Sequence, residues 1–379
     1  MDVKKTILLV CGLLLVLFSG YELNDDISIK ILDEIFQGNS DNLDKIDEVK
    51  KIEKIEEVQN MIYNLEENVS IKPELVFCKY NNCEEFVVNI IRNTTTKIKC
   101  AFYELDNIEV IDSFKYLNDK GVDIEILVDD RYLNESGFVD LKKLDNIKIY
   151  SDKKRGTRYN NYMHDKFCVI DDDIFFTGSA NPTETGLVKN NNNILKFESK
   201  YLVQNYDREF EQMKSGVYGT NKKSVLKYNN LTMNYQNLSY KISTYFCPQD
   251  DCLTPVLDVL DSAENEILFA SFAFTNDDIV AKLKMKKYQG VNVSGVMESR
   301  SKGLKGSDYE DMKGSFSLVL DKNKNTMHHK FFVVDGRYIV TGSMNPTGSG
   351  VKYNDENIII IENIEMAQKF REEFLRLVE

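Results

Sequence analysis

The sequence predicts an α/β fold in which two similar halves follow an N-terminal helical stalk. A series of apolar strands alternating with amphipathic helices occurs twice along the chain, which is typical of layered α/β domains. The second occurrence repeats short motifs of the first in the same order. The 379 residues, 42% of them hydrophobic, are enough to bury a core in each half.

Residues 1–22 have the character of a membrane-targeting segment. Lys4 and Lys5 precede an apolar run from Ile7 to Phe18, and acidic residues follow. The lysines predict that the N-terminus stays in the cytoplasm while the remainder lies outside. Because the residues before Ser19 fit a cleavage site poorly, a signal anchor is favoured over a cleaved signal peptide. We therefore expect a membrane-anchored extracytoplasmic protein, or alternatively a secreted one.

The rest of the chain divides into a stalk, two repeats and a connector. The stalk is expected at 23–72, because apolar residues recur every three or four positions over residues 41–67 among Lys and Glu. The first repeat is expected at 73–215 and the second at 240–379. A polar stretch at 216–239, rich in Asn, Lys and Tyr, is expected to connect them.

The clearest match between the repeats surrounds two of the three histidines. One segment reads Met163-His164-Asp165-Lys166-Phe167 and the other Met327-His328-His329-Lys330-Phe331. Five residues after each lysine stands an aspartate, and seven residues later a Gly-Ser-x-Asn-Pro-Thr turn begins. The side chains that this pattern supplies are Asp171, Ser179, Asn181 and Thr183 in the first repeat and Asp335, Ser343, Asn345 and Thr347 in the second.

These residue types suit the cleavage of a phosphodiester. Residues two apart on a strand share a face, so each histidine points with its lysine. Two such sets give ammonium groups to hold phosphate oxygens, one imidazole to attack phosphorus and one to protonate the leaving oxygen. A lone histidine is ordinarily a core residue, but the repetition of the whole pattern argues against that interpretation. No metal site is expected, because lysine rather than a second ligand follows each histidine.

The paired segments resemble the signature of the phospholipase D superfamily, and the resemblance covers both repeats. It implies two pseudo-two-fold related α/β sandwich halves with one active site between them. It also implies a metal-independent, cofactor-free mechanism through a covalent phosphohistidine. The residues that match its phosphate-binding sets are His164, Lys166, Asn181, His328, Lys330 and Asn345. Asp171 and Asp335 match its aspartates and are expected to be structural, with Ser179 and Ser343 in supporting positions.

One departure from this pattern makes the halves chemically unequal. Members of the superfamily usually carry an acid after the motif that orients an imidazole. Glu356 lies 28 residues after His328, whereas Asn192 stands 28 residues after His164. By analogy with two-copy members, Glu356 would orient His164 of the other half, making His164 the nucleophile and His328 the general acid. Pairing within one half would reverse these roles.

Four cysteines form two matching C-x4-C pairs, Cys78 with Cys83 and Cys247 with Cys252. Outside the cytoplasm, two local disulfides are the favoured interpretation. A single four-cysteine zinc site and four reduced thiols are the alternatives. Cys100 and Cys168 stand in apolar strands and are expected to be buried.

The sequence leaves the substrate open between nucleic acid and phospholipid. The Pro-Thr ending of each turn resembles the nuclease-like branch, and the basic and aromatic residues over 153–162 suit a polyanion. The net charge of −13 argues against a broad, non-specific grip on nucleic acid, and a membrane anchor favours lipid head groups. We expect a nuclease, with a phospholipase D-type hydrolase or transphosphatidylase second. An inactive membrane-tethered scaffold is the alternative of another class. The catalytic unit is expected to be monomeric.

Overall fold

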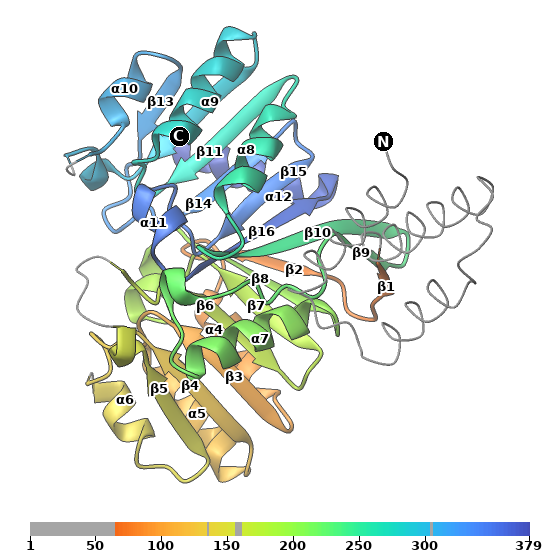
Figure 1. Cartoon of the computed structure of the whole chain (residues 1–379), viewed down its shortest axis with the longest axis vertical. Coiled ribbons are helices and arrows are strands. Elements are labelled where there is room, and N and C mark those ends of the chain that lie inside the picture. The colour runs from red at the N-terminus through yellow and green to blue at the C-terminus, as the bar shows by residue number, and fades with distance from the viewer. Residues whose placement is uncertain (1–64, 135, 156–160, 304–305) are drawn as a thin grey trace, which may run out of the picture.

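A computed structural model describes residues 65–134, 136–155, 161–303 and 306–379, and these form two α/β halves. In Figure 1 the first half (orange to green) lies below the second half (cyan to blue). The predicted helical stalk and membrane-targeting segment lie outside the described residues, except for the end of the stalk. Among the described residues, no helix is both long and apolar enough to cross a membrane.

The first half is built on a mixed seven-stranded sheet in the order β2-β8-β7-β6-β3-β4-β5. Its strands are β2 (Glu74–Phe77), β3 (Lys97–Phe102), β4 (Asp123–Val128), β5 (Ile147–Ser151), β6 (Lys166–Ile170), β7 (Ile174–Gly178) and β8 (Asn193–Glu198). Strands β3, β4 and β5 pair in parallel, and the other pairs are antiparallel. Strand β6 is buried along its whole length, as the apolar run over residues 167–170 predicts for a central strand.

The second half repeats this sheet. Its order is β1-β9-β10-β16-β15-β14-β11-β12-β13, so that β10 onward matches β2 onward strand for strand. The strands are β1 (Glu66–Asn68), β9 (Leu231–Tyr235), β10 (Leu238–Cys247), β11 (Glu266–Ser271), β12 (Asn292–Met297), β13 (Ser317–Leu320), β14 (Lys330–Val334), β15 (Tyr338–Gly342) and β16 (Glu356–Glu362). The common order confirms the prediction of two related α/β halves.

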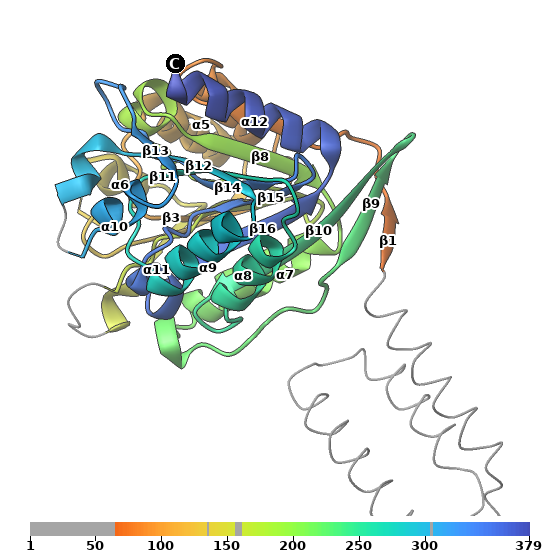
Figure 2. The same ribbon diagram turned by 90° about the horizontal axis from the view of Figure 1, so that it is seen from above.

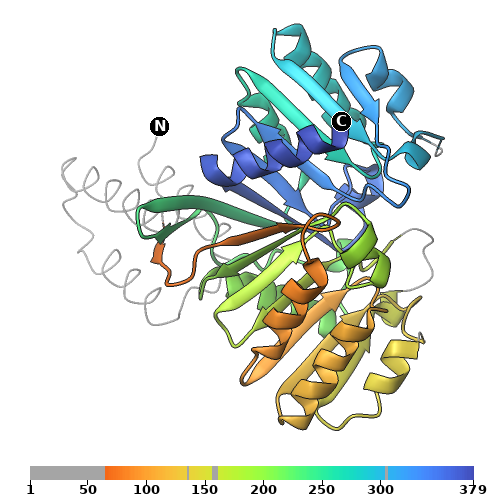
Figure 3. The same cartoon turned by 180° about the vertical axis from the view of Figure 1, so that it is seen from behind.

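Helices cover both faces of each sheet (Figures 2 and 3). The α-helices are α4 (Cys83–Arg92), α5 (Ile108–Asp119), α6 (Ser136–Leu141), α7 (Leu202–Lys214), α8 (Leu253–Asp261), α9 (Asp277–Tyr288), α10 (Tyr309–Lys313), α11 (Gly348–Lys352) and α12 (Ile364–Val378). Single turns are η1 (Asp152–Arg155), η2 (Thr185–Lys189), η3 (Gly219–Asn221) and η4 (Ser299–Gly303). Helices α4 and α5 enclose an outer core in the first half, and α8 and α9 enclose one in the second.

A third core runs through both halves and joins them. It lies under α7 and α12, on the sheet faces opposite to the outer cores. Tyr206 of α7 packs edge-on against Phe246 of β10, with ring centroids 5.0 Å apart. Phe77 of β2 makes the reciprocal contact with Phe370 of α12, at 5.1 Å. Because this apolar interface is close-packed, side chains contributed by the two halves are held at fixed separations.

Two segments differ from the sequence-based expectation. The end of the expected stalk helix is strand β1, which pairs in parallel with β9, and Thr232 N donates to Leu65 O at 2.7 Å. The expected connector contains β9 itself and the start of β10. Backbone pairing at the edge of the second sheet therefore outweighs the helical periodicity of the local sequence.

The structure closes both predicted cysteine pairs as disulfides, Cys78–Cys83 and Cys247–Cys252. Because each pair bonds to itself, the alternative of a shared zinc site is wrong, and no metal-binding cluster occurs among the described residues. A third disulfide, Cys100–Cys168, joins neighbouring strands β3 and β6 and was not predicted. The matching positions in the second half hold Phe269 and Phe332, whose rings lie 5.9 Å apart.

Candidate active site

Each histidine segment crosses to the opposite half. His164 N donates to Asp355 O at 2.9 Å, just before β16 of the second half. His328 N donates to Asn191 O, also at 2.9 Å, just before β8 of the first half. The first bridge brings Glu356, which begins β16, beside His164 of the first half. The second brings Asn192, which precedes β8, beside His328 of the second half.

The carboxylate of Glu356 lies against the first histidine. His164 Nδ1 is 2.7 Å from Glu356 Oε2, and Asn354 Nδ2 donates to Oε1 at 3.0 Å. Glu356 is fully buried. Because a carboxylate accepts, His164 carries its hydrogen on Nδ1 and keeps the Nε2 lone pair for chemistry.

An amide occupies the equivalent place beside the second histidine. His328 Nδ1 is 3.0 Å from Asn192 Oδ1, which also accepts from Ser179 Oγ at 2.8 Å. Asn192 Nδ2 donates to Gly186 O at 2.9 Å, which fixes the amide orientation. His328 therefore also has its hydrogen on Nδ1, but its partner carries no charge. Glu356 of the second half therefore lies against His164 of the first half, and the surroundings of the two histidines are unequal.

Two buried lysines accompany the histidines. Lys166 Nζ donates to His164 O at 2.6 Å, and Lys330 Nζ donates to His328 O at 2.8 Å. Burial lowers the pKa of Lys166 to about 8, against the opposing effect of Glu356. Burial together with the charge of Lys166 lowers the pKa of Lys330 well below its usual value. Ammonium groups in a desolvated site are suited to an anionic ligand.

The same surroundings act on the imidazoles and on the carboxylate. Burial and the two lysines lower the pKa of His164 and of His328 well below the usual value of histidine. Burial raises the pKa of Glu356 to about 7, although Lys166, Asn354 and Ser343 oppose this shift. Both imidazoles are therefore neutral in the unliganded protein at neutral pH.

The Gly-Ser-x-Asn-Pro-Thr turns bring further polar groups to the site. A Cβ on Gly178 would lie 2.1 Å from Asn193 O, so only glycine allows this close approach of β7 and β8. Thr183 Oγ1 accepts from Gly186 N at 2.9 Å and closes the turn. The Oδ1 atoms of Asn181 and Asn345 are buried without a hydrogen-bond partner among the described residues. Each of these oxygens therefore retains the capacity to accept a hydrogen bond from a ligand.

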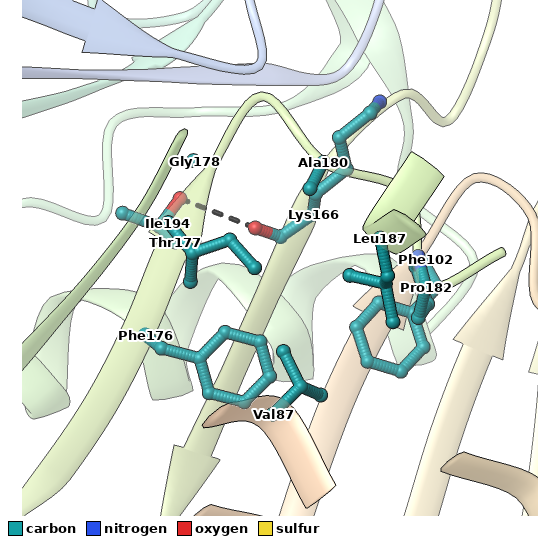
Figure 4. Close-up of a pocket in the computed structure, with 10 residues that line it drawn as sticks. All are labelled: Val87, Phe102, Lys166, Phe176, Thr177, Gly178, Ala180, Pro182, Leu187 and Ile194. Atoms are coloured by element: carbon teal, nitrogen blue, oxygen red, sulfur yellow. Dashed lines mark hydrogen bonds between the residues drawn. The ribbon is translucent and has the colours of Figure 1, made fainter. Parts of the chain in front are cut away.

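Below the first turn lies a small apolar pocket (Figure 4). Val87, Phe176 and Leu187 line it, and Lys166 reaches across its upper edge. The ammonium end of Lys166 points away from these apolar side chains, and its backbone carbonyl accepts from Thr177 Oγ1 at 3.2 Å. The pocket therefore lies beside the stem of Lys166 rather than around its ammonium group.

The motif aspartates stand apart from this chemistry. Asp171 follows β6 at the strand end opposite to Lys166, and its carboxylate accepts from Thr95 N at 2.8 Å and Thr96 N at 2.8 Å. Although partial burial opposes the shift, these hydrogen bonds lower the pKa of Asp171 to about 2. Asp335 accepts likewise from the backbone N–H groups of Glu264, Asn265 and Glu266. Both aspartates tie two loops together.

Two buried acids, Asp129 and Glu298, hold the histidine segments in place. They were not predicted from the sequence as part of the site. Asp129 Oδ2 accepts from Met163 N at 3.1 Å, and Glu298 Oε2 accepts from Met327 N at 2.7 Å. Each acid also binds the arginine two residues later, Arg131 or Arg300. An acid-x-Arg pattern precedes the histidine segment in each repeat. Because this pattern recurs together with the histidine segment, the sequence contains the information needed to predict both acids as part of the site.

A buried ionic network supports the His164 side of the site. No repeated sequence pattern predicts this network. Lys222 forms ion pairs with Asp355 and with Glu209, and all three side chains are fully buried. Burial opposes the shift, but Asp355 and Glu209 raise the pKa of Lys222 above its usual value. Since Asp355 O accepts from His164 N, the network anchors the backbone that positions this histidine.

Of the predicted polyanion-binding stretch, the structure describes only a part. Residues 156–160 lie outside the described residues, and Lys153 is exposed. Tyr162 lies beside the site, where Arg131 Cζ is 3.6 Å from the centroid of its ring.

Comparisons with known proteins agree with this architecture. A family model described as cardiolipin synthase, PLD-like domain, matches residues 87–214 and 256–378. A phospholipase D of Rickettsia bellii is 28% identical over 136 residues, 36% of this chain and 68% of that protein. A mitochondrial cardiolipin hydrolase of Chlamydomonas reinhardtii is 31% identical over 126 residues, 33% of this chain and 56% of that protein.

A solved structure extends the likeness to both halves. Phosphatidylserine synthase of Haemophilus influenzae shares 12% identity at a TM-score of 0.61, covering 85% of this chain and 90% of that one. This likeness concerns the fold. Two α/β halves with one His-x-Lys segment each define a two-fold protein with a shared site. The family model matches both halves, and the chain belongs to the phospholipase D superfamily.

The lowered histidine pKa values can be tested by NMR titration of the three imidazoles, assigned with His164→Asn and His328→Asn. We expect His164 and His328 to titrate below pH 6.5 in the unliganded protein. Inorganic phosphate should raise both midpoints, because its negative charge stabilises the imidazolium form. Lys330→Met should raise the His328 midpoint, whereas Lys143→Met, at an exposed position, should not. Midpoints above 6.5 without ligand would contradict this electrostatic description.

Proposed function

We propose that the protein is a metal-independent phosphodiester hydrolase that acts through a phosphohistidine on His164. The observation that carries this proposal is the 2.7 Å contact of His164 Nδ1 with the buried Glu356 carboxylate. When Nε2 bonds to phosphorus the ring becomes cationic, and a carboxylate stabilises that charge better than an amide does. The equivalent partner of His328 is the amide of Asn192.

In the first step, the phosphate is held by Lys166, Lys330, Asn181 and Asn345. The lone pair of His164 Nε2 attacks phosphorus, and the bond from phosphorus to the leaving oxygen breaks. The negative charge of the bound phosphate raises the pKa of His328, which takes up a proton from solvent on Nε2 and then gives this proton to the leaving oxygen.

In the second step, a water molecule replaces the released alcohol. The now neutral His328 takes a proton from this water as its oxygen attacks phosphorus. The bond from His164 Nε2 to phosphorus breaks, and the electron pair returns to the imidazole. Both histidines regain their initial protonation states, so the cycle consumes only water and the diester.

For the substrate we propose nucleic acid first. The aromatic and cationic side chains beside His164, which include Tyr162 and Arg131, suit a chain of bases and phosphates better than a saturated acyl chain. Phospholipid is the second candidate, favoured by the similarity to a phospholipase D and to a cardiolipin hydrolase. The disulfides further support a location outside the cytoplasm.

The nucleophile can be assigned with bis(p-nitrophenyl) phosphate in EDTA, because p-nitrophenolate leaves without a proton. His328→Asn should release a stoichiometric burst of p-nitrophenolate and then stall, since no base activates the water. His164→Asn should show no burst. Each substitution should lower kcat by about 10²–10⁴-fold. A burst from His164→Asn alone would reverse the assignment, and a rate that EDTA abolishes and metal restores would contradict the metal-independent mechanism.

The substrate class can be tested with the full chain on single-stranded DNA, on RNA and on vesicles containing cardiolipin. We expect a higher kcat/KM on an oligonucleotide than on the vesicle phospholipid, because a base and a phosphate engage the site together. His328→Asn serves as the matched inactive control on every substrate. Faster cleavage of cardiolipin would contradict the nuclease proposal and favour the second candidate.

A further inference from the structure

Four side chains form a cluster next to the site on the first half only: Tyr103, Arg131, Tyr132 and Tyr162. We call them the tyrosine–arginine cluster. The rings of Tyr103 and Tyr132 lie 4.9 Å apart, and those of Tyr103 and Tyr162 lie 6.0 Å apart. Arg131 Cζ is 3.6 Å from the ring centroid of Tyr162 and 5.2 Å from that of Tyr103. All three rings are partly exposed to solvent.

The cluster adjoins the candidate nucleophile. The Tyr103 ring meets the His164 ring edge-on at 4.8 Å, and Lys166 Nζ is 5.3 Å from its centroid. Burial and the hydrogen bond with Tyr132 raise the pKa of Tyr103, so its hydroxyl stays protonated. Tyr103 therefore offers an aromatic surface to a ligand rather than an acid or a base.

Arg131 is fixed before any ligand arrives. Its Nε donates to Asp129 Oδ1 at 2.6 Å and its Nη2 to Asp129 Oδ2 at 2.5 Å, while 42% of the side chain remains exposed. A guanidinium held flat by a bidentate carboxylate and lying over a tyrosine presents a planar cationic surface at a low entropic cost.

The second half lacks this arrangement. At the positions of Tyr103, Tyr132 and Tyr162 it has Phe272, Ser301 and Thr326. Phe272 meets His328 at 4.9 Å, as Tyr103 meets His164. Arg300, the counterpart of Arg131, instead donates to Asn325 O and to Thr326 Oγ1. The two sides of the phosphate site therefore differ in what they offer to the groups attached to phosphorus.

We propose that the tyrosine–arginine cluster is a stacking subsite for an unpaired nucleobase, on the nucleotide that stays attached to phosphorus in the phosphoenzyme. This inference rests on the proposed function. In-line attack by His164 places the leaving oxygen on the far side of phosphorus, toward His328, so a group beside His164 is retained. Bases stack on tyrosine rings and on guanidinium planes only when they are unpaired. The substrate is therefore single-stranded at the cleavage point.

The test uses single-stranded oligonucleotides with one cleavable phosphodiester and an abasic residue on one side of it or on the other. The retained side is the one whose product carries the phosphate. Loss of the base on that side should lower kcat/KM by about 5- to 150-fold, the usual range for a lost stacked base. Loss of the base on the leaving side should have a much smaller effect.

Variants then connect the base to the cluster. In Tyr162→Ala the ratio of kcat/KM for the normal and the retained-side abasic substrate should fall toward one. Tyr162→Phe should preserve this ratio, because the ring remains. Tyr288→Ala, at a residue 93% exposed on α9, is the matched control and should also preserve it.

The outcomes separate this inference from the proposed function. A larger effect of the leaving-side base, or an unchanged ratio in Tyr162→Ala, would overturn the stacking subsite. Cleavage of cardiolipin vesicles and methyl p-nitrophenyl phosphate without cleavage of any oligonucleotide would also overturn it, while the hydrolase proposal would stand. Absence of turnover on all three kinds of substrate would instead refute the proposed function itself.

Discussion

The hydrogen bond between His164 Nδ1 and Glu356 Oε2 is the interaction on which the organisation of the site depends. It spans 2.7 Å between residues contributed by opposite halves, and its carboxylate is fully buried. A buried carboxylate is stable only when hydrogen bonds compensate for its desolvation. His164, Asn354 and nearby Lys166 provide that compensation. Separating the halves would remove the imidazole from the acid and the acid from the imidazole, and would leave the acid only the partners within its own half.

The scaffold is symmetric, whereas the chemistry that it holds is not. Seven strands, one Gly-Ser-x-Asn-Pro-Thr turn and one His-x-Lys segment occur in the same order in each half. The chemical differences surround the two imidazoles. Glu356 contacts His164, whereas Asn192 holds the equivalent position beside His328. The ionic network of Lys222 and the tyrosine–arginine cluster both lie on the His164 side only. The two lysines lie in a desolvated site, to which an anionic phosphate group is suited. A duplicated fold can in this way assign one histidine to attack and the other to proton transfer.

The sequence predicted the parts of this arrangement that repeat. The α/β halves, the buried β6 and the local cysteine pairs each depend on short spacings, which a single sequence displays. The pairing of Glu356 with His164 was one of two open alternatives, because spacing does not reveal which half an acid faces. In the structure His164 N donates to Asp355 O, which brings Glu356 beside His164.

What the sequence did not predict depends on contacts between distant segments without a repeated counterpart. Cys100 and Cys168 are 68 residues apart, and phenylalanines replace them in the second half. Strand β1 continues a helical pattern and becomes extended only because β9 offers an edge to pair with. Lys222 stands in a polar segment where a buried charge has no local signal, since its two acidic partners come from α7 and from the residue just before β16.

The most direct test of the unequal site exchanges its two orienting groups. In the double variant Asn192→Glu with Glu356→Asn, the composition of the site is kept, but the carboxylate now faces His328. The phosphoenzyme formed from a labelled diester is quenched under alkaline conditions, and the histidine-containing peptides are separated. We predict that the label lies on the His164 peptide in the natural protein and moves to the His328 peptide in the exchanged one. Label that stays on His164 after the exchange would contradict the claim that Glu356 selects the nucleophile.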